Sequence, residues 1–155
     1  MPEGDDDREG RVDELASLLS IDADFVRQLL PSPIVAVDIQ HRAGVLWYAA
    51  GEPALVLVGV DGSTVSVAEP AIQWDGPHTP ILIARRVVDL SREGVAAEME
   101  DDLRRALAAE IKAARAARMR RFRTCQECGT RTPPEWLHSA TLCSACAERN
   151  HGVVY

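Results

Sequence analysis

Aromatic residues are scarce in this chain, and cysteines are absent from most of it. Phe, Trp and Tyr together make up 5% of the 155 residues, whereas hydrophobic residues as a whole make up 46%. A buried core is therefore expected, and it must consist mainly of Val, Leu, Ile and Ala. The length suits one compact domain with a small appended module.

Long apolar runs are also missing. The longest one, Ala54 to Val60, is far shorter than the roughly 20 residues that a membrane-spanning helix needs. The N-terminus is acidic where a secretory signal would be basic and then apolar, so we expect a cytoplasmic protein with no membrane contact. The net charge of −7 argues against a chain that coats nucleic acid with its whole surface.

Several catalytic signatures are lacking as well. The chain has no P-loop, no GxGxxG after a strand, no GxSxG elbow and no HExxH motif. Asp38 and His41 form a weak acid–base pair, for which two surface polar residues near a turn are the plainer interpretation. We therefore expect a protein that is not an enzyme.

The first 30 residues change from an acidic segment to a helical one. Residues 1–10 carry five carboxylates against one Arg, which predicts a disordered acidic tail. In residues 11–30 apolar residues recur at helical spacing, which predicts two short helices. Pro31 and Pro33 end the second helix, because proline lacks an N–H and disfavours helix in the residue before it.

These two helices also have the spacing of a DNA-binding helix-turn-helix. Ala16, Ser20 and Val26 occupy the packing positions of that motif. Asp22 and Asp24 would begin the recognition helix, where carboxylates meet phosphate badly. A helical pair that packs on the rest of the fold, or that docks a partner, is the favoured interpretation.

From residue 34 to about residue 90 the apolar period falls from 3.6 to 2, which predicts strands. The expected strands are 34–39, 45–49, 54–60, 64–68, 72–74 and 81–88. Asp61-Gly62 gives the sharpest hairpin signal, since a tight turn needs positive φ and glycine supplies it. Many short strands in succession predict an antiparallel meander or a small barrel, covered in part by the flanking helices.

Three aromatic residues fall within these strands. Trp47, Tyr48 and Trp74 are expected in the core or on a face of the sheet. Two of them on one exposed face would instead suggest RNA binding, because unpaired bases stack on aromatic side chains.

Residues 95–122 return to the helical period and predict one long helix. Acidic residues gather at its start and basic residues at its end, an order that complements the helix dipole. The basic end consists of Lys112, Arg115, Arg118, Arg120, Arg121 and Arg123. Such a run can bind the phosphates of RNA or DNA, an acidic protein surface, or carboxylates of the chain itself.

The four cysteines form two CxxC pairs at the C-terminal end: Cys125, Cys128, Cys143 and Cys146. This pattern predicts one structural Zn2+ held by four thiolates, in preference to two disulfides or another metal. The two-residue spacer lets one tight turn aim two sulfurs at one ion, and Gly129 suits that turn. Because four cysteines complete the coordination shell, His138 and His151 are expected at the surface rather than as ligands.

Short elements are expected around the cysteines. Thr132-Pro-Pro-Glu135 has the form of a capping box, which predicts a helical turn that places Trp136 and Leu137 over the zinc. The second cysteine pair is predicted to open a helix over residues 144–150, ended by Gly152.

The segment resembles a known zinc finger. Cys128-Gly129, Pro133-Pro134 and Leu142-Cys143-Ser-Ala-Cys146 resemble the finger of the DksA/TraR family of RNA polymerase-binding regulators. The resemblance implies a treble-clef-like finger after a long helix, with the four cysteines as ligands. The family has a longer spacer between its cysteine pairs and a coiled coil with an acidic tip, neither of which is predicted here. The resemblance therefore does not imply that this chain shares the family's function in the polymerase channel.

The sequence thus predicts an α+β protein in four parts: a disordered acidic tail (1–10), a helical pair with a β domain (11–90), a long helix with a basic end (91–123) and a zinc finger (124–155). The favoured function is a non-enzymatic zinc-binding adaptor or regulator that contacts nucleic acid or a nucleoprotein machine, such as a ribosome or RNA polymerase, through the basic helix end and the finger. The alternatives are a regulator that binds proteins and uses zinc only as a staple, and an enzyme with a pocket in the β domain. The sequence gives no indication of oligomeric state.

Overall fold

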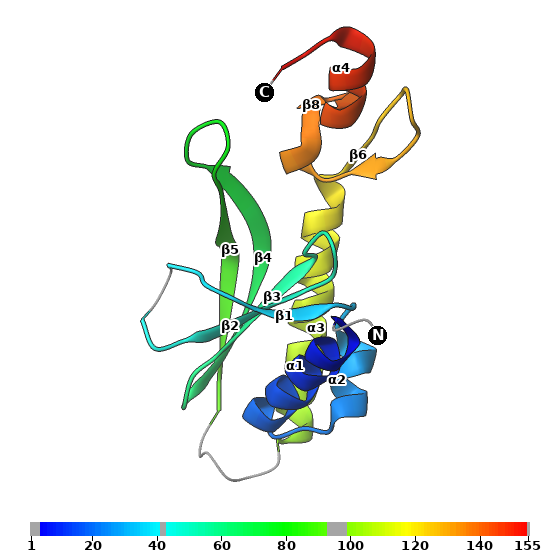
Figure 1. Ribbon diagram of the computed structural model, residues 1–155. Coiled ribbons are helices and arrows are strands. Elements are labelled where there is room, and N and C mark those ends of the chain that lie inside the picture. Colours follow the sequence, from blue (N-terminus) through cyan, green and yellow to red (C-terminus); the bar gives the residue numbers. More distant parts are fainter. Residues whose placement is uncertain (1–3, 41–42, 93–98, 155) are drawn as a thin grey trace.

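An antiparallel sheet of five strands forms the centre of the molecule, and three helices pack on one of its faces (Figure 1). The computed structural model describes residues 4–40, 43–92 and 99–154. The main body contains α1 (Gly4–Leu19), α2 (Ala23–Leu29), β1 (Ile34–Val37), β2 (Leu46–Ala50), β3 (Val56–Val60), β4 (Thr64–Trp74), β5 (Pro80–Ser91) and α3 (Asp101–Arg120). The C-terminal module contains β6 (Arg123–Thr124), β7 (Arg131–Thr132), the 3₁₀ turn η1 (Pro134–Trp136), β8 (Leu137–Ser139), β9 (Leu142–Cys143) and α4 (Ser144–His151). The predicted α+β class is confirmed.

The helical pair forms, but its first helix begins earlier than the sequence suggests. α1 starts at Gly4 and so includes most of the segment predicted to be a disordered tail. Acidic residues are favourable in the first turn of a helix, because the positive end of the dipole lies there, so an acidic composition does not prevent this start. α2 begins after Asp22, whose side chain accepts a hydrogen bond of 2.8 Å from the backbone N–H of Phe25.

The strands follow one another across the sheet in chain order, from β1 at one edge to β5 at the other. Every neighbouring pair is antiparallel, which confirms the predicted meander. The alternative of a closed barrel is wrong, because β1 and β5 lie at opposite edges. The hairpin turn forms at Asp61, whose Oδ1 accepts hydrogen bonds of 2.8 and 2.7 Å from the backbone N–H groups of Ser63 and Thr64. The predicted reason is wrong, because Gly62 does not have a positive φ and the Asp61 side chain closes the turn instead.

Strand β4 joins two segments that the sequence predicts as separate strands, 64–68 and 72–74. Pro70 suggests a break between them, since proline cannot donate to a ladder. The pairing of β3 with β4 ends at Ala68, so Pro70 sits where β4 has a neighbouring strand on one side only. β4 and β5 therefore continue past the rest of the sheet as a long hairpin that reaches toward the C-terminal module (Figure 1).

A bulge bends this hairpin. Val67 pairs with Val88 and Glu69 pairs with Arg85, so two residues of β5 lie opposite the single Ala68. One of the two is Arg86, whose φ of 51° falls in the left-handed region. Such an extra residue interrupts the ladder and increases the local twist.

Two buried clusters lie on opposite faces of the sheet. The larger one brings side chains of α1, α2 and α3 against the strands, and it includes Leu15, Val26, Tyr48, Val58 and Leu107. The smaller one contains Ile39, Trp47, Ala49, Leu57 and Ala68. Trp47 and Tyr48 are therefore core residues, as predicted. Trp74 is not, because it ends β4 beyond the other strands and is 45% exposed.

Helix α3 keeps the predicted apolar stripe. Leu107, Ile111 and Ala114 are buried in the larger cluster. The helix begins at Asp101, and residues 95–98 of the predicted helix lie outside the described part of the chain. Its C-terminal end carries the C-terminal module away from α1 and α2 (Figure 1).

Tyr48 connects the sheet to α1, since its hydroxyl donates a hydrogen bond of 2.5 Å to Oε1 of Glu14. Burial and this carboxylate raise the pKa of Tyr48 to about 12, above the value of about 10 in an unfolded chain. A group whose pKa rises on folding stabilises the protein while it is protonated, so this contribution should be lost as the pH rises from about 10 to 12. Between about pH 8 and pH 11.5, urea unfolding should show about 1–2 kcal/mol less stability. A Tyr48→Phe variant should lose less, and an equal loss in that variant would contradict the assignment.

Candidate metal centre and its surroundings

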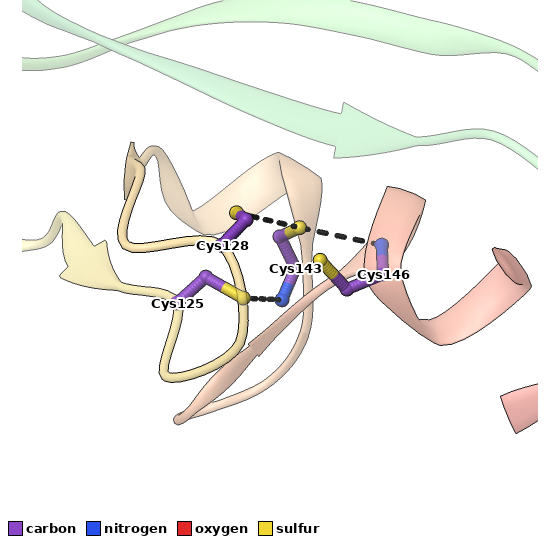
Figure 2. A group of neighbouring side chains, drawn as sticks. All are labelled: Cys125, Cys128, Cys143 and Cys146. Carbon is purple, nitrogen blue, oxygen red and sulfur yellow. Dashed lines mark hydrogen bonds between the residues drawn. The ribbon is translucent and has the colours of Figure 1, made fainter. Parts of the chain in front are cut away.

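The first cysteine pair lies in the tight turn between β6 and β7. The backbone N–H of Gly129 donates a hydrogen bond of 2.8 Å to the carbonyl of Cys125, and the N–H of Cys125 donates one of 3.0 Å to the carbonyl of Thr130. Gly129 has a φ of 72°, which glycine adopts without strain. The turn therefore has the predicted form, with Cys125 and Cys128 on the same side of it (Figure 2).

The second pair lies at the start of α4. Cys143 is the residue before the helix, and its sulfur accepts from the N–H of Cys146 in the first turn. The helix ends at Gly152 in a left-handed conformation with φ of 65°. The predicted short helix is confirmed and extends one residue further, to His151.

The four sulfur atoms converge on one point (Figure 2). All four Sγ atoms lie within 4.8 Å of one another, and those of Cys128 and Cys143 are 3.8 Å apart. In a tetrahedron with metal–sulfur bonds of about 2.3 Å, the sulfurs are separated by about 3.8 Å. Cys125, Cys143 and Cys146 are buried, and Cys128 is exposed. The four cysteines are therefore positioned to bind one metal ion.

Hydrogen-bond donors surround these sulfurs. The N–H of Cys143 donates to Sγ of Cys125, and the N–H of Cys146 donates to Sγ of Cys143, both at 3.4 Å. Nη2 of Arg149 lies 3.7 Å from Sγ of Cys146. Donors of this kind spread the negative charge of a thiolate, and they are typical of the outer shell of a metal site.

The thiols differ in how readily they ionise. Hydrogen bonds from the backbone N–H groups of Cys128 and Cys143 lower the pKa of Cys125 to about 6. The hydrogen bond to Cys143 and burial raise the pKa of Cys146 to about 12. Four sulfurs this close do not all carry a charge at neutral pH without a cation between them. A metal ion would supply that cation and displace the remaining protons.

The segment between the two cysteine pairs differs from the prediction. Residues 134–136 form a 3₁₀ turn without a side-chain cap, and the Thr132 hydroxyl instead donates to the carbonyl of Thr130 at 2.9 Å. The predicted capping box is therefore wrong. Trp136 does not cover the cysteines either, because it is 56% exposed. Among the described residues, the apolar side chain packed against the cysteine cluster is Leu142, and not Leu137 as predicted.

Glu135 attaches the finger to the main body. Its two carboxylate oxygens accept hydrogen bonds from Nη1 and Nη2 of Arg118, whose Nε also donates to the carbonyl of Ala54 at 3.0 Å. The side chains of Arg118 and Glu135 are 2% and 6% exposed. The guanidinium also lies over the ring of Phe122, 5.2 Å from its centre. One buried cation therefore joins α3, the turn before β3 and the finger.

The predicted basic run is divided by this arrangement. Arg118 is buried in the pair with Glu135, so it faces no solvent. Arg121 is half-exposed, and its Nε donates to the buried carboxylate of Glu69 at 2.5 Å. Arg123 donates to the backbone carbonyls of Arg120 and Phe122 at the end of α3. The other three members are at least partly exposed and have no ion pair within the described residues: Lys112, Arg115 and Arg120.

Charge is distributed unevenly along the chain. Residues 112–155 contain eight Lys and Arg against three Asp and Glu, a net charge of +5. Residues 1–111 contain nine against 21, a net charge of −12. The positive part comprises the second half of α3 and the finger, which lie together at one end of the molecule (Figure 1).

The remaining candidate residues take no part in the cysteine cluster. His41 lies outside the described residues, so the pair that it was predicted to form with Asp38 is not placed. His138 and His151 are exposed, and Nε2 of His151 lies 2.5 Å from Oε1 of Glu127. Ala16 and Val26, two positions of the helix-turn-helix spacing, are buried in the larger cluster.

Comparison with known proteins gives no relative. The chain matches no protein family, no curated protein and no solved structure. The resemblance to the DksA/TraR finger therefore rests on the cysteine pattern and its neighbouring residues alone. Among the described helices, none combines the length and the apolar character needed to cross a bilayer.

Proposed function

We propose that the four-cysteine cluster holds one zinc ion in a structural role. Zinc is the usual metal of tetrahedral four-thiolate sites, and the sulfur spacing fits its bond length. A shell of four protein ligands leaves no open position for water or substrate, which favours a structural over a catalytic metal. The ion would join the turn that carries Cys125 and Cys128 to the start of α4, where Cys143 and Cys146 lie.

We further propose that the protein is a non-enzymatic adaptor that contacts nucleic acid, alone or within a nucleoprotein complex. The observation that carries this proposal is the separation of charge, with +5 over residues 112–155 and −12 over the remainder. Two negative charges from four thiolates around a divalent ion would still leave that part positive. A polyanion would therefore be attracted to the finger end and repelled by the α1 end.

The exposed cations of α3 define the proposed contact surface. Lys112, Arg115 and Arg120 have no ion pair within the part of the chain that the structure describes, so they are available to phosphates. Arg118 is left out, because its guanidinium is buried against Glu135. Arg121 is left out of the variant below, because removing it would strand the buried carboxylate of Glu69.

The same cations would also suit an acidic protein surface, which is the second candidate function. Salt dependence distinguishes the two, because contacts with nucleic acid release condensed counterions and weaken steeply as salt rises. A protein partner held by apolar contacts would bind with little dependence on salt.

Replacing Lys112, Arg115 and Arg120 together by Gln should weaken nucleic-acid binding by at least about tenfold near 100 mM salt. Each phosphate contact contributes about 0.7–0.9 to the slope of log affinity against log salt, so the slope should fall by about 2–3. Fluorescence anisotropy with labelled RNA and DNA, titrated between about 50 and 200 mM salt, measures both quantities.

A triple variant of Arg11, Arg27 and Arg105 is the matched control. It removes the same charge from exposed ion pairs on α1, α2 and the first half of α3. Its salt slope should equal that of the unmodified protein. Equal slopes for all three proteins, or no binding to any polyanion at low salt, would rule the proposed surface out.

A further inference from the structure

A groove separates the β4–β5 hairpin from the finger. It has a volume of about 230 Å³ and lies between Trp74 at the end of β4 and Trp136 on η1. Its other walls are apolar and are formed by Pro53, Ala54, Ile72, Pro80 and Leu82. The two tryptophans are 45% and 56% exposed, so each keeps about half of its surface available to a ligand.

The groove offers a ligand no unpaired charge. Arg118 and Glu135 line it, and each neutralises the other in a bidentate pair. The third nitrogen of Arg118, Nε, donates a hydrogen bond to the carbonyl of Ala54. A ligand inside the groove therefore meets apolar walls, two indole rings and an ion pair in which every nitrogen of Arg118 and both oxygens of Glu135 already have a partner.

The size of the groove favours one flat group of a larger ligand. Pockets that enclose whole small molecules usually measure about 300–1,000 Å³. At about 230 Å³ the groove is below that range, and it is partly open to solvent. It therefore suits one ring of a polymer whose remainder stays outside.

Cations flank the groove along α3. Arg115 and Arg121 lie three residues on either side of the groove-lining Arg118, within one helical turn of it. Arg115 has no ion pair within the described residues and carries the positive charge beside the groove, whereas Arg121, although 48% exposed, is paired with Glu69 through Nε. A polymer that places a ring in the groove would therefore run past positive charge as it leaves it.

We infer that the groove takes an unpaired base of single-stranded nucleic acid, stacked on Trp74 and Trp136, while the neighbouring phosphates lie along the cations of α3. The inference rests on the proposed function and narrows the partner from nucleic acid in general to single strands. A base within a duplex is stacked and paired, so it does not reach the groove. Aromatic platforms beside a cationic track are the usual means by which proteins hold single strands without reading their sequence.

Tryptophan fluorescence of the full, zinc-loaded chain tests the inference directly. The probes are a mixed-sequence single strand of RNA, the same strand of DNA, its duplex, and a strand of equal length that lacks bases but keeps its phosphates. Both single strands should quench the emission, whereas the duplex and the abasic strand should not. Trp47 is 3% exposed and does not line the groove, so it should contribute unquenched emission.

Trp74→Ala and Trp136→Ala should each weaken single-strand binding by about tenfold, the usual cost of losing one stacked base. Both variants should keep the salt slope, since they leave the phosphate contacts in place. Leu46→Ala is the matched control, because Leu46 is an equally exposed apolar side chain on β2 that does not line the groove. It should bind single strands as the unmodified protein does.

Four results would overturn the inference. Equal binding of the abasic strand, or unchanged single-strand affinity in both tryptophan variants, would remove the stacked base and leave the cationic surface intact. Absence of binding to every oligonucleotide would remove the proposed function as well. Salt-insensitive binding of a protein that is lost in Trp74→Ala, with no quenching by any strand, would assign the groove to a protein segment.

Discussion

Replacing Cys143 by Ser should abolish binding of one zinc equivalent and unfold the finger, while the helix–sheet body stays folded. Cys143 supplies a ligand and also caps α4 by accepting from the N–H of Cys146; because the serine hydroxyl oxygen can accept the same hydrogen bond, the change removes the ligand and keeps the cap. Binding of structural zinc contributes roughly 10–16 kcal/mol in isolated finger peptides, far more than the stability that the small core of this module supplies. Without the metal, we expect residues 123–152 to lose their fixed structure.

Metal content and hydrogen exchange measure this outcome. Metal analysis should give one zinc per chain for the unmodified protein and none for the variant. Amide protection should disappear from the finger and persist in β2, β3 and α3. Ser144→Ala is the matched control, since it changes the neighbouring residue and no ligand. Full zinc content in Cys143→Ser would contradict the assigned shell.

The affinity for zinc should also fall as the pH falls. Binding requires four thiolates, and Cys146 holds its proton tightly because its pKa is raised to about 12 by the hydrogen bond to Cys143 and by burial. Zinc must displace that proton, so protons compete with the metal, and chelators should remove it more readily at acid pH.

Replacing Arg118 by Ala should destabilise the protein by about 3–5 kcal/mol, which is a large effect for a single substitution. The substitution removes the partner of Glu135, whose side chain is 6% exposed in the unmodified protein, and it also removes the donor to Ala54. An uncompensated buried charge is the main cost of breaking such a pair. Denaturant unfolding, followed by circular dichroism, measures the change in free energy.

A double variant separates the charge from the packing. Arg118→Met with Glu135→Leu keeps most of the apolar volume and strands no charge, so it should be much less destabilised than Arg118→Ala. Arg105→Ala, which breaks the exposed pair with Asp102, should cause no measurable change. If Arg118→Ala were as stable as Arg105→Ala, the pair would not hold the finger in place.

The sequence predicted those parts of the main body whose structure follows from the spacing of apolar residues along the chain. Periods of 3.6 and 2 located the helical pair, the meander and the stripe of α3, because burial of one face imposes those spacings. The sequence did not predict that residues 64–68 and 72–74 form one continuous strand. Whether Pro70 breaks the strand depends on where the neighbouring strand β3 ends, and this cannot be seen from the local pattern. The start of α1 was missed because an acidic composition fits a disordered tail and a first helical turn equally well.

The cysteine site was predictable to the residue, and its surroundings were not. Two CxxC pairs fix the ligands, because only a short turn brings two sulfurs to one ion. Thr132 and Glu135 satisfy the capping-box pattern, but Glu135 meets Arg118 across the fold and a buried ion pair outweighs a local cap. The six cations between residues 112 and 123 also depend on contacts across the fold, and they do not form one exposed patch. The position of each residue on the helix decides its exposure, and Arg118 is buried.

The bulge in β5 affects whether two copies of this chain can pair through the edges of their sheets. β5 is a long strand at the edge of the sheet, and an edge of regular geometry offers unpaired backbone groups to any other strand. The two residues opposite Ala68 break that regularity, and Arg85 and Arg86 place two exposed charges beside the break. A second copy aligned antiparallel about this point would face like charges and a mismatched ladder. The left-handed backbone of Arg86 therefore acts against aggregation through the sheet edge.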